Sequence, residues 1–328
     1  MDSSVTQEKT TWKQRCFYAS YTLCAGVGLF VLGRVSLRSL GYFIKRKRSL
    51  AERYGSNSWA LITGATDGIG KTFAQTLAGE KFNLLLVGRN PSLLELSQKE
   101  ILANHPEIQV ATQCYDFSQI TETTQYSIFD EISKNYDISL FVSCAGITQF
   151  DRFHETGEKL ISDLIKVNVT PSVTITRKIL PKMLERKSLS GLIFVSSYTC
   201  LNEMPFVSVY AGTKGFVDSF ARSLAIEYAD KLDVLSLTPY YVSTKMTRNM
   251  KPSFETVTRD VVVEQALNDL GRKRQSFGSL NHFLIDLLYR ISPVRWSDYF
   301  KHKKMGKMIA TVDQMKRLRR KASKNKVE

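Results

Sequence analysis

Residues 63–70, with the sequence Thr63-Gly-Ala-Thr-Asp-Gly-Ile-Gly70, are the stretch that decides the fold of this 328-residue chain. The apolar run Trp59–Thr63 predicts a strand before it, and the sequence beyond it predicts a helix that ends near Gly79. Glycines let the backbone turn tightly and approach a phosphate, while the free N–H groups at a helix amino terminus attract one. A dinucleotide phosphate is therefore expected here, with contacts from Gly64, Thr66, Gly68, Ile69 and Gly70.

Beyond this turn, short apolar runs alternate with helix-like segments. Further strands are expected at Asn83–Val87, Val110–Cys114, Ser139–Ser143, Gly191–Ser196 and Val234–Thr238, with a helix at Ser92–Ala103. Alternating strands and helices predict right-handed crossovers and a doubly wound parallel α/β sheet of the Rossmann type. Because such sheets bind ligands beyond the carboxyl ends of their strands, the site residues should follow those ends.

Two polar residues follow predicted strands where a dinucleotide would extend. Arg89 follows the second strand, where an NAD enzyme usually has Asp or Glu for the ribose 2′-hydroxyl. A guanidinium there can pair with a 2′-phosphate, so NADPH (NADP when oxidised) is the expected cofactor. A solvated arginine at a strand end is the alternative. Asp116 follows the third strand and is expected near the adenine ring, with a turn-capping aspartate as the alternative.

A second group of residues favours hydride transfer to a carbonyl. Tyr210 and Lys214 are four positions apart, so on a helix they share one face, and Ser197 follows the fifth strand. Reduction of a ketone needs a proton at oxygen, which a tyrosine can donate. The lysine ammonium and an oxidised nicotinamide are together expected to lower the tyrosine pKa. Ser197 and Tyr210 would bind the substrate oxygen, and Asn168 could hold a water that links Lys214 to solvent.

These motifs resemble the short-chain dehydrogenase/reductase family over about residues 58–245. The family's Asn-Asn-Ala-Gly segment reads Ser143-Cys144-Ala145-Gly146 here, which bears on the stability of the sheet rather than on the chemistry. The resemblance implies a catalytic tetrad of Asn168, Ser197, Tyr210 and Lys214, and cofactor contacts by Asn168, Tyr210, Lys214 (at the nicotinamide ribose) and Thr244.

A narrower resemblance concerns the apolar segment before the domain, the segment Pro239-Tyr-Tyr-Val-Ser-Thr-Lys-Met246 and the basic tail. These are similar to a membrane branch with very-long-chain 3-oxoacyl-CoA reductases and 17-beta-hydroxysteroid dehydrogenases of types 3 and 12. The resemblance implies reduction of a long-chain 3-oxoacyl-CoA, with other fatty-acid elongation enzymes as partners. Reduction of a steroid or another lipid ketone is the alternative. A catalytically silent scaffold is a third hypothesis, which the intact tetrad disfavours. A homodimer through helices near 173–184 and 216–228 stays open.

The net charge of +15 is concentrated at the two ends of the chain. Residues 1–53 contain ten Lys/Arg and three Asp/Glu, and residues 301–328 contain eleven and two. Basic ends beside apolar segments fit an anionic membrane surface better than nucleic acid, whose enzymes carry basic patches on the folded domain. The uncharged run Cys16–Gly33 would span about 27 Å as a helix and predicts a membrane span. A signal peptide, or a hairpin with both ends in the cytosol, is the alternative.

Charge also predicts the orientation and the location of the chain. More Lys/Arg follow the apolar segment than precede it, so the catalytic domain is expected to face the cytosol. Lys324 and Lys326 resemble a dilysine retrieval signal for the endoplasmic reticulum membrane, with a solvated basic tail as the alternative. The five cysteines form no CxxC pair, so neither a metal site nor a disulfide framework is expected.

The carboxyl-terminal quarter is less regular. The resemblance to the family implies that residues 251–275 cover the substrate. Residues 277–300 are apolar but interrupted by charges and a proline, so they are expected to lie in a membrane interface or to re-enter the membrane. An ordinary core helix is the alternative for the second segment. The expected domains are an anchor with a basic linker (1–53), a Rossmann catalytic domain (54–250), a lid with a membrane-associated segment (251–300) and a basic tail (301–328).

Overall fold

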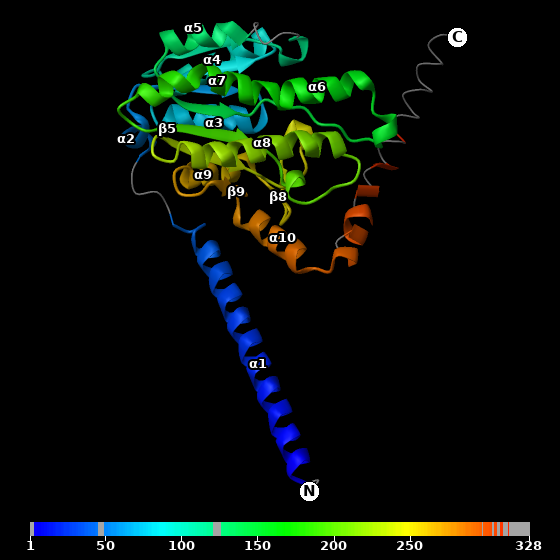
Figure 1. Cartoon of the computed structure of the whole chain (residues 1–328). Helices are drawn as coiled ribbons and strands as arrows, with labels where there is room; N and C mark the ends of the chain where they lie inside the picture. Colours follow the sequence, from blue (N-terminus) through cyan, green and yellow to red (C-terminus); the bar gives the residue numbers. More distant parts are fainter. Residues whose placement is uncertain are drawn as a thin grey trace, which may run out of the picture. The chain divides into compact units, whose positions relative to one another are not determined.

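The computed structural model describes residues 3–44, 49–120, 126–296, 298–303, 305–306, 309–310 and 314. The chain divides into two compact units, Met1–Lys45 and Arg46–Glu328. The first unit contains the long helix α1 (Ser3–Leu40), shown in blue in Figure 1. Within it, Phe17–Leu37 has a mean hydropathy of 1.4, is not buried, and is long and apolar enough to cross a membrane. The expected amino-terminal apolar helix is therefore confirmed.

The second unit is built around a seven-stranded sheet whose recorded strand pairs are all parallel, in the order β3-β2-β1-β4-β5-β6-β9. The predicted strands agree with the observed ones to within two residues, and the Rossmann sheet is confirmed. The last strand was not predicted, because it has only two residues and no apolar run marks it. The strands are β1 (Trp59–Thr63), β2 (Asn83–Gly88), β3 (Val110–Cys114), β4 (Ile138–Ser143), β5 (Ser190–Val195), β6 (Leu232–Leu237) and β9 (Gln275–Ser276).

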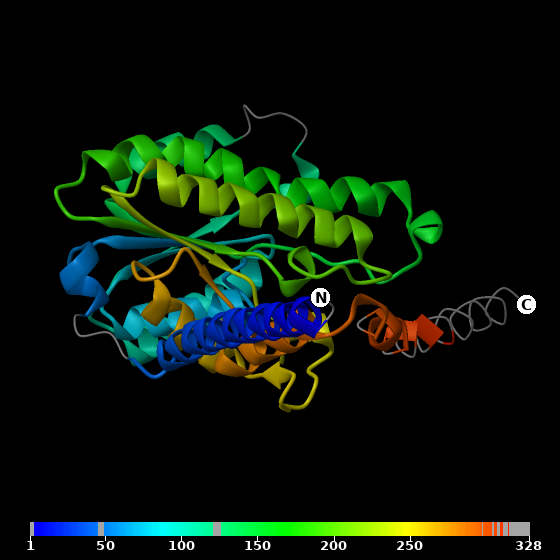
Figure 2. The same ribbon diagram turned by 60° about the horizontal axis from the view of Figure 1, so that its bottom comes forward.

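Helices cover both faces of this sheet (Figures 1 and 2). The described elements include α2 (Leu50–Tyr54), α3 (Gly68–Gly79), α4 (Pro91–Asn104), α5 (Ile128–Asn135), α6 (Glu158–Asn168), α7 (Thr170–Glu185), α8 (Ser208–Glu227), α9 (Arg259–Asp269) and α10 (Leu280–Ile291). Short elements between them are η1 (Phe117–Gln119), η3 (Phe153–Glu155), η4 (Tyr198–Cys200), η5 (Lys245–Thr247) and the paired strands β7 (Tyr241–Val242) and β8 (Thr256–Val257).

Alternation along the strands explains the two helical layers. Side chains of successive strand residues point to opposite faces, so an apolar run of five or six residues supplies both cores. Ile62 and Leu86 belong to the core that α3, α4 and α9 complete. Leu61 and Phe141 belong to the core that α5, α7 and α8 complete. All four side chains are fully buried, as expected for a sheet that helices cover on both faces.

The short helix α2 belongs to the second unit. Tyr54 is fully buried, and Arg53 forms an ion pair of 2.5 Å with Asp233 on β6. The last residues of the segment expected to be an anchor and linker, 50–53, therefore pack on the catalytic body.

The point where strand order reverses lies at β1, which is between β2 and β4. Thr63 is in register with Val87 on one side and with Ser143 on the other. The segments that follow these strands therefore leave the sheet at one level, where open α/β sheets bind ligands. We call this edge, where the strands end, the carboxyl edge, and the opposite edge, where they begin, the amino edge.

Candidate active site at the carboxyl edge

The glycine-rich turn is held against the end of β2 by backbone hydrogen bonds. Gly64 and Ala65 N–H donate to the carbonyl oxygen of Val87, at 2.9 and 3.3 Å. Gly64 and Gly68 have φ of +68° and +56°, which side chains disfavour. A Cβ on Gly70 would lie 2.3 Å from the oxygen of Gly64, so the turn closes only with glycine there. This is a close-fitting cradle at the amino terminus of α3, as predicted.

The remaining turn residues pack toward β2 and the core. Thr66 is half-buried, and its Cγ2 would be 3.1 Å from a Cβ on Gly88. Ile69 packs against the core, so its backbone N–H is the group left for a phosphate. Arg89 is exposed and follows Gly88 directly. Arg89 thus follows β2 directly, next to the glycine that lies against Thr66, and its contact with a 2′-phosphate stays a prediction.

The structure gives different surroundings to two further residues that were predicted to contact the cofactor, Thr244 and Asp116. Thr244 Cγ2 would be 3.4 Å from a Cβ on Gly68, and Lys245 pairs with Asp67 at 3.2 Å. The segment after β6 therefore lies against the glycine-rich turn. Asp116 caps η1, where its carboxylate accepts hydrogen bonds from the Ser118 N–H and hydroxyl at 3.0 and 2.8 Å. The capping role is thus observed for Asp116, and adenine contact stays a prediction.

Ser197, Tyr210 and Lys214 converge beyond β5. Tyr210 and Lys214 lie on α8, with Nζ 5.8 Å from the centroid of the tyrosine ring. The Tyr210 hydroxyl is hydrogen-bonded to Ser197, whose oxygen also accepts from the Thr199 hydroxyl at 3.1 Å. Lys214 Nζ donates to the carbonyl oxygen of Val195 at 2.7 Å. The spacing of these residues was sufficient to predict this grouping.

Asn168 joins the group from the end of α6. Its Oδ1 accepts from the Ile147 N–H at 2.8 Å, and its Nδ2 donates to the Ile147 carbonyl and the Thr213 hydroxyl, both at 3.0 Å. A Cβ on Gly146 would be 3.4 Å from both Asn168 Oδ1 and Lys214 Nζ. The four tetrad residues therefore surround one small region, and the water relay through Asn168 stays a prediction.

Burial sets the protonation of the tyrosine and lysine. Desolvation raises the pKa of Tyr210 to about 12, and the hydrogen bond with Ser197 offsets only part of this. Desolvation lowers the pKa of Lys214 to about 8. In the protein alone, burial therefore outweighs the polar neighbours of Tyr210, and the lowering of its pKa by Lys214 together with an oxidised nicotinamide stays a prediction. Tyr210 therefore keeps its proton at neutral pH and can donate it, and the lysine next to it has a pKa close to neutral pH.

The sequence did not reveal two hydroxyl groups that organise the site. Thr63 Oγ1 accepts from the N–H groups of Cys144 and Ala145 at 3.0 and 3.1 Å, which fixes the segment after β4 next to the turn. Thr213 Oγ1 binds Asn168, as described above. Threonine is common in strands and tolerated in helices, so neither position carried a signal that separates this role from packing.

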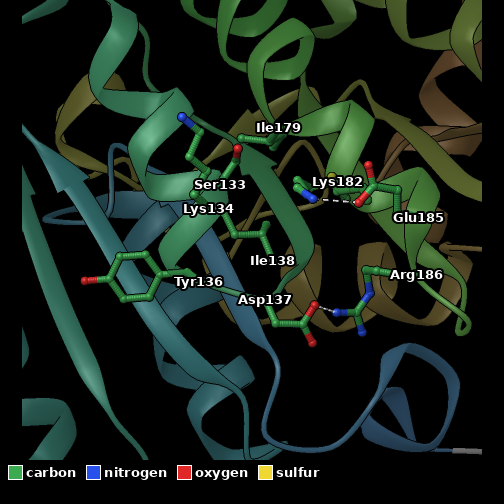
Figure 3. A pocket seen from close by; sticks show the side chains of 10 residues that line it. Ser133, Lys134, Tyr136, Asp137, Ile138, Ile179, Lys182, Glu185 and Arg186 are labelled. Atoms are coloured by element: carbon green, nitrogen blue, oxygen red, sulfur yellow. Dashed lines mark hydrogen bonds and ion pairs between the residues drawn. The ribbon is translucent and has the colours of Figure 1, made fainter.

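A cavity of about 310 Å³ lies elsewhere, at the amino edge between α5 and α7 (Figure 3). Ile138, the first residue of β4, lines it, whereas the tetrad lies beyond the carboxyl ends of the strands. Ion pairs of Lys182 with Glu185 and of Arg186 with Asp137 close part of its wall. This cavity contains no residue of the catalytic group.

The geometry agrees with known proteins. Residues 58–254 match the family described as short chain dehydrogenase. The very-long-chain 3-oxoacyl-CoA reductase of Caenorhabditis briggsae is 31% identical over 277 residues, which are 82% of this chain and 87% of the relative. The human protein named inactive hydroxysteroid dehydrogenase-like protein 1 is 31% identical over 77% of this chain and 78% of its own.

Solved structures support the fold at lower identity. A 7beta-hydroxysteroid dehydrogenase superposes with a TM-score of 0.69 and 22% identity over 79% of this chain and 100% of that chain. A short-chain dehydrogenase from Sphingobium yanoikuyae, solved with NADPH, gives 0.61 and 22% over 76% and 95%. Because the family match covers more than half of the residues and a relative is 31% identical over 82% of the chain, the chain belongs to the short-chain dehydrogenase/reductase family of oxidoreductases.

Proposed function

We propose that the chain reduces a long-chain 3-oxoacyl-CoA to the 3-hydroxyacyl-CoA with NADPH, as a step of fatty-acid elongation. The observation that carries this proposal is the convergence of Ser197, Tyr210 and Lys214 beside Asn168 at the carboxyl edge. Relatives named very-long-chain 3-oxoacyl-CoA reductase, at 31–32% identity over most of the chain, support the choice of substrate.

The residues divide the chemistry between them. NADPH, when bound, supplies a hydride to the carbonyl carbon. Tyr210 donates its proton to the carbonyl oxygen, and burial keeps that proton in place because it raises the pKa to about 12. Ser197 donates a hydrogen bond to the same oxygen as negative charge develops on it. Lys214 is only 4% exposed, and its pKa of about 8 is close to neutral pH. It can therefore return a proton to Tyr210.

The cradle at β1 and β2 fits a dinucleotide, and Arg89 supports NADPH over NADH. The close approach of Gly64, Gly70 and Gly88 leaves backbone N–H groups at the amino terminus of α3. Arg89 is exposed beside it, and in the described residues it is in no ion pair, so its guanidinium is available for a 2′-phosphate.

An apolar and aromatic cluster supports a lipid ketone as substrate. Tyr198, Met204 and Val207 are buried next to the half-buried Tyr210. Such apolar surroundings suit a long acyl chain and a steroid equally. A steroid or another lipid ketone is therefore the second candidate. One human relative is named as an inactive hydroxysteroid dehydrogenase-like protein. For this reason the hypothesis of a catalytically silent scaffold is also tested below.

The location of the protein is part of the same proposal. The apolar segment Phe17–Leu37 of α1, with basic residues before and after it, supports anchoring in the endoplasmic reticulum membrane with the catalytic unit in the cytosol. The dilysine pair Lys324 and Lys326 lies outside the described residues. Other elongation enzymes as partners, and a homodimer through α7 and α8, stay predictions.

The test is NADPH oxidation by the detergent-solubilised full chain, with a long-chain 3-oxoacyl-CoA and a 17-ketosteroid at equal concentration. Turnover of the acyl-CoA alone is expected. Turnover of the steroid alone would reverse the order of the candidates. NADPH binding without turnover of any lipid ketone would support the scaffold.

A further inference from the structure

The segment after β9 combines buried contacts with exposed apolar side chains. It consists of α10 and of residues 294–296 and 298–303, which are also helical. One face packs on the catalytic unit through Tyr289 and, just beyond, Met305. The same segment also exposes six apolar side chains whose exposed fractions are 54–75%, namely Leu288, Ile291, Val294, Trp296, Tyr299 and Phe300. We call these six residues the apolar face.

The buried contacts hold this segment next to the catalytic group. The ring of Tyr289 lies 6.2 Å from that of Tyr198, the residue after Ser197. Met305 is 4% exposed, and its sulfur accepts a hydrogen bond of 3.6 Å from the Tyr241 hydroxyl. Lys301 is 6% exposed, with Nζ 5.8 Å from the centroid of Tyr289. The segment is therefore packed in a defined position, and its apolar face is presented on a fixed support.

The apolar face has the composition of a membrane interface. Trp296, Tyr299 and Phe300 follow the i, i+3, i+4 spacing that places side chains on one side of a helix. Tyrosine and tryptophan are favoured at the level of lipid headgroups, where the ring is in an apolar medium and its polar atom reaches water. Monomeric soluble proteins rarely leave so many large apolar side chains together in water.

The charges around the apolar face are mainly basic. Arg295 and Lys303 are exposed, and Lys303 Nζ lies 5.7 Å from the centroid of the Tyr299 ring. Arg290 is exposed and pairs with the buried Asp286, while the exposed acid Asp298 pairs with Lys301. The chain continues with further lysines and arginines, eleven against two acids over 301–328. A basic rim around aromatic residues complements an anionic lipid surface.

We infer that the apolar face lies in the interfacial region of an anionic bilayer, as a membrane contact separate from α1. Because Tyr289 and Met305 of the same segment pack with Tyr198 and Tyr210, this contact brings the lipid to within the width of a helix, on the order of 10 Å, of that cluster. A lipid ketone can thus pass from the bilayer into the site without crossing bulk water. This inference holds for any lipid ketone, whichever one the chain reduces.

The direct test places a fluorescent reporter on the apolar face. The chain has three tryptophans, so Trp12→Phe/Trp59→Phe leaves Trp296 as the only one. The full chain is reconstituted in phosphatidylcholine vesicles with or without phosphatidylserine, with bromine on the lipid chains near the headgroup or near the chain end. Stronger quenching by the shallow bromines, increased by phosphatidylserine, is expected. Absence of quenching would overturn the inference, and stronger quenching by the deep bromines would replace the interfacial contact with a spanning one.

A functional test uses Trp296→Ser/Tyr299→Ser/Phe300→Ser, with Leu96→Ser/Val261→Ser as the matched control, since both controls are exposed apolar residues on other helices. We expect KM for a vesicle-delivered lipid ketone to rise roughly tenfold or more, because interfacial burial of aromatic side chains is lost. The kcat for a short water-soluble ketone and NADPH binding should not change. An unchanged KM for the lipid ketone would contradict the inference.

A charge variant covers the case in which the triple variant does not fold. Arg295→Glu/Lys303→Glu retains the apolar face and changes only exposed basic residues. It should weaken the effect of phosphatidylserine on Trp296 quenching, because two of the basic residues that attract the anionic surface become acidic while the others of 301–328 remain. A dependence on phosphatidylserine equal to that of the wild type would show that these two charges do not face the lipid.

Discussion

Two basic side chains at the amino and carboxyl edges of the sheet differ in their partners: Arg53 at the amino edge has a carboxylate partner, whereas Lys214 at the carboxyl edge has none among the described residues. Arg53 donates two hydrogen bonds to the Asp233 carboxylate at 2.5 and 3.0 Å, and the Tyr54 hydroxyl donates a third at 2.8 Å. At the carboxyl edge Lys214 is more deeply buried, yet in the described part of the chain it is in no ion pair and binds the carbonyl oxygen of Val195.

The difference shows in the pKa values. The carboxylate of Asp233 raises the pKa of Arg53, so the pair stays charged and the sheet gains a stabilising contact. Desolvation lowers the pKa of Lys214 to about 8 and raises that of Tyr210 to about 12, so the charged form of each is disfavoured. Pairing serves stability at one edge, and its absence leaves groups that can exchange protons at the other.

The largest expected effect is the loss of the proposed proton donor. Tyr210→Phe removes the hydroxyl while the ring remains, so turnover should fall on the order of 10³-fold and NADPH binding should be retained. Tyr228→Phe, at the carboxyl end of the same helix, is the control and should be fully active. Steady-state turnover together with fluorescence titration of NADPH measures both. Turnover above a tenth of wild type in Tyr210→Phe would remove this residue as the acid.

Replacing the unpaired ammonium should change the pH dependence of stability. Below pH 8 both folded and unfolded chains carry a charged Lys214, and the folded state bears the desolvation cost. Between pH 8 and 10.5 only the unfolded state keeps the proton, so this residue makes the chain more stable as pH rises, by up to about 3 kcal/mol.

Lys214→Met removes that dependence. The stability difference between wild type and variant, from urea unfolding of cofactor-free protein, should therefore shift in favour of wild type from pH 8 to 10.5. A pH-independent difference would show that the folded lysine titrates normally. Turnover by the variant should be strongly reduced at every pH, because Tyr210 loses its proton source.

At the amino edge, replacement of a basic residue by methionine should lower the stability of the fold, because Arg53 has a carboxylate partner that Lys214 does not have. Arg53→Met leaves the Asp233 carboxylate, 13% exposed, without its main partner and should reduce the free energy of unfolding by about 1–3 kcal/mol. Lys99→Met breaks an exposed pair with Glu95 and should hardly change the free energy of unfolding. The kcat of both variants should equal that of wild type. Equal stability of the two variants would contradict the role assigned to the amino edge.

The smallest expected effect concerns cofactor choice at the carboxyl edge. Arg89 is exposed and free of ion pairs in the described residues, so its replacement should hardly change stability. Arg89→Asp should shift preference from NADPH toward NADH by about 10–100-fold, the value of a charge-assisted contact. Arg89→Met should weaken NADPH without improving NADH. An unchanged ratio of kcat/KM for the two cofactors in both variants would mean that Arg89 does not contact the 2′-phosphate.

Local patterns were sufficient for the sheet and for most of the tetrad. The turn at 63–70 needs glycines because its φ angles and close contacts exclude a Cβ, and that requirement is visible in the residue types. Tyr210 and Lys214 are four residues apart, and this spacing alone places them on one face of a helix. The apolar runs in the sequence end within one or two residues of the ends of the strands. Periodicity and backbone conformation depend on near neighbours, so the sequence by itself determined them.

Tertiary structure decided what depends on distant segments. Arg53 meets Asp233 across 180 positions, and Asn168 meets Thr213 across 45. Met305 reaches the cluster of Tyr198 only because α10 turns back on the catalytic unit. Burial raises the pKa of Tyr210 in the protein without cofactor, and the residue types around it do not reveal that burial. Burial and pairing arise when separate elements pack together, and no local pattern encodes which side chains then share a dry or a charged environment.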